Sequence, residues 1–344
     1  MATLQKTGLW AGLVLISISL VACSGGNDSS TDDSMEQENS VTLVRNDAEK
    51  KIEVLVNGEL FTVYIYPESV SKPVLYPIKS AGGNVLSRGF PLENRPGERV
   101  DHPHHVGIRF NYGDVNGLDF LNNSDAIPAE KKAGYGTIVH TEILSTKESR
   151  EGAELEVSAD WIAPDGRILL KETTQYIFTS VGEKRIIDRI TTLKAYGQDV
   201  SFTDNKEGML GIRVARELEH PSSKPEIFTD ANGIATAVPT LNNEGVTGMY
   251  RSSEGIEGDD VWGTRGKWVN LSGEINGEKL SLAIIDHPKN MGYPTYWHAR
   301  GYGLFAANTL GQKAMSGGKE ELNFKLKDGE SVTFRYRIVV NSGS

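Results

Sequence analysis

The residues best suited to chemistry lie in one short run, Asp101-His-Pro-His-His105, which holds three of the seven histidines of the chain. Imidazole titrates near neutral pH, so clustered histidines suit proton transfer, and they are also common ligands of zinc, copper and iron. Residues 106–111 then alternate between apolar and polar side chains, which predicts a strand with one buried face. If that strand reaches back to His104, then His104 shares the buried face, and His105 shares the opposite face with Arg109.

A second polar stretch follows the apolar run 280–285. It opens with Asp286-His287-Pro288, which repeats the tripeptide Asp101-His102-Pro103. Further along, four side chains would project to one side of an extended segment, namely Tyr296, His298, Arg300 and Tyr302. Aromatic rings cover the C–H face of a sugar, while arginine and histidine reach its hydroxyl groups. The stretch predicts a sugar-binding wall; the alternative is a buried aromatic strand whose His and Arg satisfy backbone groups.

The third stretch, 207–214, alternates as a strand whose even-numbered residues face the core. Glu207 and Arg213 then share the other face. At roughly 3.3 Å per residue they lie about 20 Å apart, so they cannot pair with each other. Glu207, near the start of the strand, is the best general-base candidate, and a solvated glutamate at a strand end is the alternative.

These stretches favour an enzyme that acts on a carbohydrate or sugar derivative by acid–base chemistry, as an epimerase, lyase or hydrolase. We expect His105, Glu207 and His298 to transfer protons. The residues expected to bind or polarise a small-molecule or oligosaccharide substrate are His102, His104, Arg109, Asp119, Arg213, His287, Tyr296, Trp297, Arg300 and Tyr302.

Two other functions stay open. His102 and His104 would share one strand face and are candidate ligands of a divalent metal, with a third ligand from His287 or His298. No spacing here is diagnostic of a metal site in the way of H-E-x-x-H, so no cofactor is assigned. The other possibility is a non-catalytic glycan-binding lipoprotein, whose aromatic side chains bind sugar without turnover.

The N-terminus has the pattern of an export signal. Lys6 precedes an apolar run at 9–22, which is shorter than the ~20 residues of a membrane helix. Leu20-Val-Ala-Cys23 resembles the bacterial lipobox, so we expect a signal peptide at 1–23, a lipid on Cys23 and a flexible acidic tether at 24–40. The protein would then be lipid-anchored in the bacterial cell envelope, in the periplasm or on the outer-membrane surface. An ordinary cleaved signal peptide with a chance cysteine is the alternative.

Composition restricts the part of the chain that follows. Cys23 is the only cysteine, so the residues beyond it hold no disulfide, thiolate metal site or cysteine nucleophile. The formal net charge is −10, and no basic stripe offers the contacts that phosphates need. We therefore expect no nucleic-acid partner.

The elements that must position these residues have the patterns of strands. Asn57-Gly58 separates two alternating runs, which is a strong hairpin signal, and Asp165-Gly166, Asn276-Gly277 and Asp328-Gly329 repeat it. No long segment has apolar residues at helical spacing. Many short strands joined by tight turns predict an all-β protein with one large antiparallel β-sandwich at 41–341, and two smaller stacked sandwiches are the alternative.

Four segments together resemble the bacterial family labelled methane oxygenase PmoA-like, namely Asp101-His-Pro-His-His105, 113–120, 206–215, and 286–288 with 294–305. The resemblance implies a soluble, exported β protein, often lipid-anchored, and the label implies an oxygenase. Unlike a true particulate methane monooxygenase subunit, this chain has no apolar run beyond 1–23 that approaches the ~20 residues of a membrane helix. The strand-rich pattern is also similar to the galactose-mutarotase-like supersandwich of aldose epimerases, in which a His acid and a Glu base act on a sugar.

Overall fold

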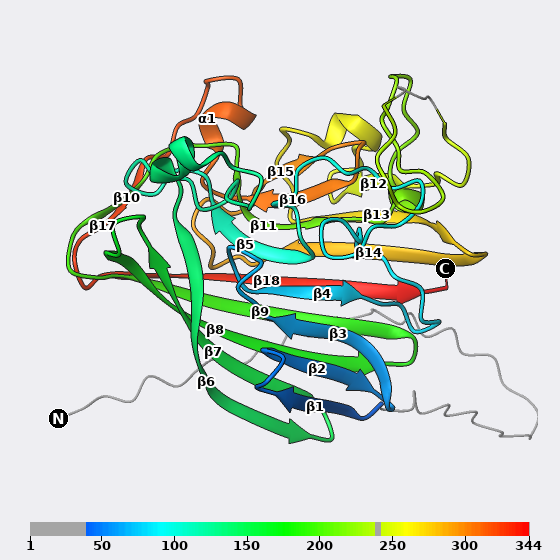
Figure 1. Ribbon diagram of the computed structural model, residues 1–344, viewed down its shortest axis with the longest axis horizontal. Helices are drawn as coiled ribbons and strands as arrows, with labels where there is room; N and C mark the ends of the chain where they lie inside the picture. The colour runs from blue at the N-terminus through cyan, green and yellow to red at the C-terminus, as the bar shows by residue number, and fades with distance from the viewer. Residues whose placement is uncertain (1–38, 238–241, 344) are drawn as a thin grey trace, which may run out of the picture. The chain divides into compact units, whose positions relative to one another are not determined.

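Two eight-stranded antiparallel sheets make up most of the structure (Figure 1). The first has the strand order β1-β2-β3-β4-β5-β11-β16-β15, and the second has the order β12-β13-β14-β18-β9-β8-β7-β6. A separate two-stranded sheet pairs β10 with β17. The structure is a computed structural model that describes residues 39–237 and 242–343. The expected signal peptide, the lipid site at Cys23 and most of the tether lie outside the described residues.

The strands of the first sheet are β1 (Val41–Asn46), β2 (Lys51–Val56), β3 (Glu59–Ile65), β4 (Val74–Ile78), β5 (Ile108–Tyr112), β11 (Gly208–Arg213), β15 (Tyr296–Ala299) and β16 (Leu304–Asn308). Those of the second are β6 (Thr137–Ser149), β7 (Gly152–Ile162), β8 (Ile168–Val181), β9 (Lys184–Ala195), β12 (Met249–Ser252), β13 (Trp268–Ile275), β14 (Glu278–Asp286) and β18 (Ser331–Ser342). The small sheet pairs β10 (Val200–Phe202) with β17 (Phe324–Leu326), and the short helices are η1 (Ala129–Gly134), η2 (Arg216–Leu218), η3 (Gly258–Val261) and α1 (Gln312–Met315).

This architecture confirms the prediction of an all-β protein with a large antiparallel β-sandwich. Two predicted hairpins, β2–β3 and β13–β14, turn at Asn57-Gly58 and Asn276-Gly277, and all four turn residues have the positive φ that such tight hairpins require. The buried apolar residues form one cluster, in which Phe110 of β5 packs against Phe334 of β18 with 5.6 Å between ring centroids.

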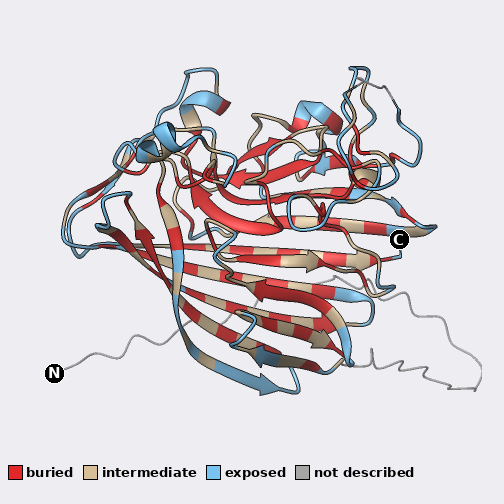
Figure 2. Cartoon of the chain, viewed as in Figure 1, coloured by how far each residue is buried: buried red, intermediate tan, exposed pale blue. Residues whose placement is uncertain are grey.

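Burial divides the first sheet into two parts (Figure 2). β2 alternates between buried and partly exposed residues, as expected of a strand with one covered face. Every residue of β5, β11, β15 and β16 is buried. Because successive side chains of a strand point to opposite faces, both faces of these four strands are covered. The second sheet covers one face, so loops cover the other, which we call the outer face.

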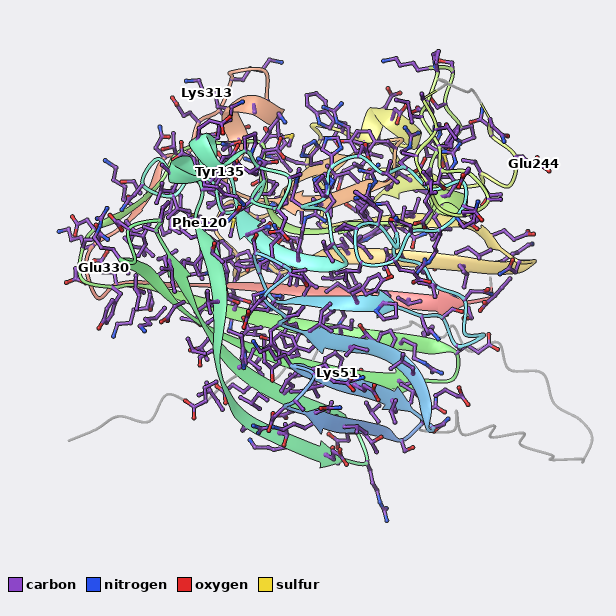
Figure 3. The ribbon with its side chains drawn as sticks, viewed as in Figure 1. Lys51, Phe120, Tyr135, Glu244, Lys313 and Glu330 are labelled. Carbon is purple, nitrogen blue, oxygen red and sulfur yellow. The ribbon has the colours of Figure 1, made fainter. Side chains whose placement is uncertain are left out.

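Side chains fill the interior (Figure 3). Phe120 is fully buried and packs against Trp161, with 5.0 Å between ring centroids, whereas Glu244, Lys313 and Glu330 are exposed. Over the described residues, no helix has the length and apolar character to cross a membrane.

Candidate functional site

A row of small residues separates Arg109 from His298 on the outer face of the first sheet. In the register of this sheet, Arg109 of β5 lies opposite Gly211 of β11, which lies opposite Ala306 of β16. Ala306 in turn lies opposite His298 of β15. Residues directly opposite each other project to the same face, and glycine and alanine have little or no side chain. Arg109 and His298 are therefore the two polar ends of one row.

The neighbouring positions on this face are polar as well. Arg213 lies two residues from Gly211, and Asn111 lies two residues from Arg109, so all share the outer face. Arg109, Asn111, Arg213 and His298 are each at most 3% exposed. Burying polar groups at this density costs free energy unless they bind one another or a ligand. The outer face thus has the properties of a binding site.

The three clustered histidines lie in a turn before β5 rather than on the strand. β5 begins directly after Gly107, and the N–H of His105 donates to the carbonyl of His102 at 2.9 Å. The prediction that the strand reaches back to His104 is therefore wrong. Gly107 has a φ of +46°, and a Cβ there would lie 2.2 Å from the carbonyl oxygen of Leu75. The chain bends at this glycine, so strand pairing starts only after it.

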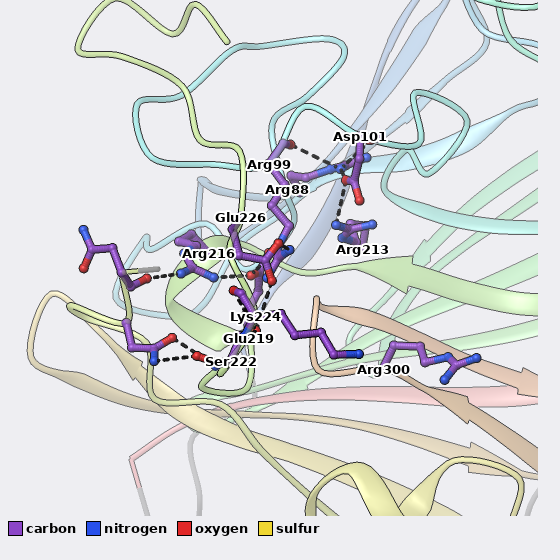
Figure 4. Close-up of polar contacts among 12 residues, drawn as sticks. Arg88, Arg99, Asp101, Arg213, Arg216, Glu219, Ser222, Lys224, Glu226 and Arg300 are labelled. Atoms are coloured by element: carbon purple, nitrogen blue, oxygen red, sulfur yellow. Dashed lines mark hydrogen bonds and ion pairs between the residues drawn. The ribbon is translucent and has the colours of Figure 1, made fainter. Parts of the chain in front are cut away.

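Two buried arginines bind the carboxylate of Asp101 (Figure 4). Arg88 Nη1 donates to Asp101 Oδ1 at 2.7 Å, and Arg213 Nη2 donates to the same oxygen at 2.8 Å. Both arginine side chains are at most 1% exposed. Burial would raise the pKa of Asp101, but the hydrogen bond from His102 and the charges of the two arginines outweigh it and hold that pKa well below its usual range. Asp101 is therefore ionised at neutral pH.

Asp101 in turn orients His102. The Nδ1 of His102 lies 2.8 Å from Asp101 Oδ2, and because a carboxylate only accepts, Nδ1 carries a proton. The other ring nitrogen, Nε2, remains available for proton transfer. The His102 ring stacks on His105 at 4.9 Å and on Tyr302 at 5.8 Å. Its side chain is 44% exposed, so it is the accessible member of this stack.

His105 has the opposite tautomer. Arg213 Nη1 lies 3.3 Å from His105 Nδ1, and because a guanidinium only donates, Nδ1 accepts and the proton lies on Nε2. Burial and the charge of Arg109 hold the pKa of His105 well below its usual value, and burial and Lys72 lower the pKa of His104 to about 2. Neither Nε2 atom has a hydrogen-bond partner within the described part of the chain. At neutral pH His105 is thus an uncharged hydrogen-bond donor.

His298 presents a basic nitrogen. Its Nδ1–H donates to the carbonyl of Lys206 at 3.2 Å, which leaves the lone pair on Nε2, and Arg300 Nε donates to that nitrogen at 3.4 Å. Burial lowers the pKa of His298 to about 4; the negative charge of Glu207 opposes this shift and the charge of Arg300 adds to it. Glu207 forms an ion pair with Lys206. At neutral pH His298 is an uncharged base with a carboxylate nearby.

Arg109 is a buried cation without a carboxylate partner. Among the residues that the structure describes, none accepts a hydrogen bond from its Nε or Nη1 atom, and no carboxylate forms an ion pair with it. Burial and the charge of Arg213 lower the pKa of Arg109 to about 9. Burial and the charge of Arg109 lower the pKa of Lys72, which is also buried, to about 7. Positive charge is therefore in excess around Arg109.

A cavity of about 510 Å³ is lined by two neighbours of the histidines, namely Arg300, which donates to His298, and Tyr302, which stacks on His102. The ring of Tyr302 also lies 4.6 Å from the guanidinium of Arg213. The guanidinium of Arg300 stacks on Trp262 at 4.6 Å. Other residues that line the cavity include Arg99, His220, Lys224, Glu226 and Asp259. A larger cavity of about 930 Å³ lies among segments 77–98 and 215–245, and the clustered histidines line neither cavity.

Two predicted wall residues do not face this cavity. Trp297 is fully buried on the core face and packs against Phe305 at 6.0 Å between ring centroids. This corrects its expected role, because alternation along β15 turns Trp297 away from the face of His298. Tyr296 shares that face but is 6% exposed, and the guanidinium of Arg265 covers its ring at 4.4 Å.

Asp119 and His287 are also apart from the cluster. The Asp119 carboxylate accepts the backbone N–H groups of Leu121 and Asn122, both at 2.8 Å, and so closes a turn. His287 follows β14 in the second sheet, where burial and the charge of Arg335 lower its pKa.

The expected metal ligands do not form a metal site by geometry. His102 and His104 have ring centroids 5.5 Å apart at an angle of 74°. Within residues 39–237 and 242–343, no three His, Cys, Asp or Glu side chains are grouped so that they would hold a metal ion.

The sequence patterns did not indicate how three residues contribute to the candidate site, namely Arg88, Lys72 and Trp262. Arg88 lies in an irregular loop, and Lys72 before β4, so neither belongs to an alternating run that would indicate its direction. Trp262 precedes β13, and no alternating run indicated that its ring stacks on the guanidinium of Arg300. The repeated Asp-His pair was the one available signal for the role of Asp101.

A family model matches residues 51–344 of the chain. The protein belongs to DUF6807, a family of unknown function. Membership of the PmoA-like family, predicted from four segments, is therefore wrong, and the oxygenase implied by that label loses its basis. No curated protein sequence matches the chain.

Solved structures similar to this chain are distant. The GH36 α-galactosidase AgaB from Geobacillus stearothermophilus has 12% identity and a TM-score of 0.42, over 88% of this chain and 41% of that one. The galactosidase domain of the α-galactosidase–sucrose kinase AgaSK has 10% identity and a TM-score of 0.41, over 88% and 42%. A galactose mutarotase related enzyme from Lactobacillus acidophilus has 9% identity and a TM-score of 0.30, over 88% and 97%. The chain thus spans less than half of the galactosidases, and likenesses this weak do not bear on its activity.

Proposed function

We propose that the protein is a carbohydrate-active enzyme that transfers protons on a sugar or sugar derivative. The observation that carries this proposal is that the histidines of the site differ in which ring nitrogen holds the proton. His102 and His298 each have a ring nitrogen available for proton transfer, whereas His105 offers an N–H. His102 stacks on Tyr302 and His298 accepts a hydrogen bond from Arg300, and both of these neighbours line the cavity of about 510 Å³. Acid–base catalysis requires proton-transfer groups beside the place where the substrate binds.

In this proposal the long contact from Arg300 Nε, at 3.4 Å, gives way when the substrate binds, and His298 Nε2 takes a proton from the sugar. Glu207 stabilises the imidazolium through its negative charge. His102, oriented by Asp101, delivers a proton. His105 Nε2–H stabilises the oxygen that gains negative charge, assisted by the charge of Arg213. The tautomer of His105 supports this donor role in place of the proton transfer predicted from the sequence.

The two carboxylates of the site favour an epimerase or a lyase over a hydrolase. Most glycoside hydrolases use a pair of carboxyl groups that flank the bond to be cleaved. Here two arginines bind Asp101, and Glu207 is paired with Lys206, so neither has the environment of a free acid. Imidazole bases support removal of a proton from carbon instead.

Proton NMR in D₂O tests the proposal with the full chain and a panel of neutral sugars, uronic acids and oligosaccharides. We expect one class of sugar to lose a C–H signal by exchange, which indicates an epimerase, or to gain a vinyl proton, which indicates a lyase. A new reducing-end anomeric signal would indicate a hydrolase. Binding of a panel sugar without any of these changes would contradict the enzyme and favour a glycan-binding protein.

We also propose that a lipid on Cys23 holds the protein at the bacterial envelope. The support is the segment Leu20-Val-Ala-Cys23, with its resemblance to a lipobox. Expressed in a bacterium, the full chain is expected in the membrane fraction and its Cys23→Ser variant in the soluble fraction. Equal distribution of the two would contradict the anchor.

A further inference from the structure

The cavity beside the site has an excess of cationic side chains. Arg99, Lys224 and Arg300 line it, against two carboxylates, Glu226 and Asp259. Glu226 forms an ion pair with Arg99, which also pairs with Glu219. The cationic side chains that remain are therefore Lys224 and Arg300, against the carboxylate of Asp259. No carboxylate of the described chain pairs with Lys224 or Arg300, and Figure 4 draws these two side chains without contacts to the acidic residues around them.

Arg300 is oriented for a planar anion. Its Nε is engaged by His298 Nε2, and its guanidinium stacks on Trp262, so two contacts fix the plane of the group. The two Nη groups remain, and together they form a fork that matches the two oxygens of a carboxylate. A carboxylate bound there would lie next to His298, the base of the proposed reaction.

The positive charge at this site runs against the charge of the whole protein. The chain has a formal net charge of −10, which repels anionic solutes in general. Behind the cavity, Arg88 and Arg213 share the single carboxylate of Asp101, and Arg109 has no carboxylate partner within the described residues. A cluster of cations that the fold keeps buried and underpaired is stabilised when an anionic ligand binds.

We propose that the substrate is an acidic sugar whose carboxylate binds to Arg300. This inference rests on the proposed function and names its substrate class. His298 Nε2 removes the proton from the carbon next to the carboxylate, and the electron pair of the C–H bond moves into the carboxylate, where Arg300 stabilises it. His102, protonated on both ring nitrogens, then delivers its Nε2 proton to the opposite face of that carbon, which gives the epimer and leaves His102 neutral and His298 protonated. In a lyase, a group on the next carbon leaves instead, takes the proton from His102, and a C=C bond forms.

Isothermal titration calorimetry of the full chain at low salt tests the binding. Galacturonate is compared with galactose, and glucuronate with glucose, because each pair differs only in a carboxylate. We expect the acids to bind about tenfold to a hundredfold more tightly, as for a hydrogen-bonded ion pair. Arg300→Gln is expected to abolish this preference and to weaken the binding of the neutral sugars much less than that of the acids, and Arg300→Lys to keep part of the preference.

The matched control is Arg150→Gln, which removes the same charge from an exposed turn between β6 and β7. It is expected to behave as the wild type. Equal affinity for acids and neutral sugars, or a preference that survives Arg300→Gln, would overturn the inference. Tighter binding of galactose 6-phosphate than of galacturonate would also overturn it, since the anion would then be a phosphate.

Proton exchange separates this inference from the proposed function. If acidic sugars bind through Arg300 but NMR in D₂O shows neither exchange nor product, acidic sugars are ligands of the protein and not substrates, and the proposed enzyme activity is refuted. If neutral sugars react and the Arg300→Gln variant reacts equally fast, the enzyme stands and the acidic substrate is refuted.

Discussion

The chain contains the tripeptide Asp-His-Pro twice, and the aspartate has cationic neighbours in the first copy and neutral neighbours in the second. At Asp101 the carboxylate accepts hydrogen bonds from two buried arginines and from the imidazole of His102. At Asp286 it accepts the backbone N–H groups of His287 and Thr295 and the side-chain amide of Asn290. The first copy orients an imidazole, and the second closes a turn at the end of β14.

The two carboxyl groups titrate in opposite directions for this reason. Burial raises the pKa of Asp286 to about 6, because neutral donors offset only part of the cost of burying a charge. At Asp101 the hydrogen bond from His102 and the charges of Arg213 and Arg88 outweigh burial. The tripeptide Asp-His-Pro therefore contains an ionised carboxylate that orients an imidazole only in the first copy, where segments distant in the sequence supply cations.

The largest expected difference between the copies is in turnover. His102→Gln should lower kcat about 10²- to 10⁴-fold, the usual contribution of a positioned acid–base group. His287→Gln is the matched change in the second copy and should stay within about twofold of the wild type. Steady-state kinetics on the panel sugar that the wild type converts fastest measures both, with circular dichroism as the control for folding. Equal losses in the two variants would remove the distinction between the copies.

The next largest expected difference is in the loss of stability when each carboxylate is replaced by an amide. Asp101→Asn leaves the buried side chains of Arg88 and Arg213 without an anion. Because the side chain of Asp101 itself is 39% exposed, we expect a loss near the lower end of the about 3–5 kcal/mol that breaking a fully buried pair costs. Asp286→Asn turns one acceptor oxygen into an amide that faces N–H donors, at a cost of about 1–3 kcal/mol. Urea unfolding at pH 7 gives both free energies of unfolding. A smaller loss in Asp101→Asn than in Asp286→Asn would contradict the assigned roles.

The pH dependence of stability should have opposite signs in the two copies. The folded protein holds the Asp286 proton more tightly than the unfolded chain does, so this group lowers the free energy of unfolding as pH rises from about 4 to about 6, by roughly 3 kcal/mol at most. Asp101 has a lowered pKa, so its stabilising contribution is present above about pH 4 and is lost as pH falls below it.

Urea unfolding between pH 3 and 7 compares the wild type with each Asn variant. The stability difference to Asp286→Asn should shrink with rising pH, and the difference to Asp101→Asn should grow up to about pH 4.5. Two differences that change in the same direction would show that the carboxylates have similar surroundings.

Alternation of side chains allowed much of this fold to be predicted. The Asn-Gly hairpins and period-2 runs predicted the antiparallel strands, and parity turned Arg109 and Arg213 away from the apolar face of their strands, because strand geometry is a local property. That these two residues and His298 share one face follows from the register of the sheet, which the sequence did not predict. The same parity already turned Trp297 toward the core, so its misplacement was avoidable.

Loops and long-range contacts could not be predicted in this way. Arg88 contacts Asp101 through an irregular segment, and the tautomer of His105 depends on Arg213, which lies 108 residues away in the chain. The bend at Gly107 depends on how closely Leu75 of the neighbouring strand approaches. Such features follow from tertiary packing, which the sequence pattern within one segment does not describe.

The smallest expected effect concerns the ring that covers the first copy. Tyr302 stacks on His102 and lies over the guanidinium of Arg213. An aromatic–cation contact contributes about 0.5–1 kcal/mol, so Tyr302→Leu should reduce kcat about twofold to fivefold by loosening the orientation of His102. Tyr302→Phe retains the ring and should recover most of that loss. If the Phe variant were as slow as the Leu variant, the hydroxyl group of Tyr302 would be the part that matters, and the proton donor of the site would be sought there rather than at His102.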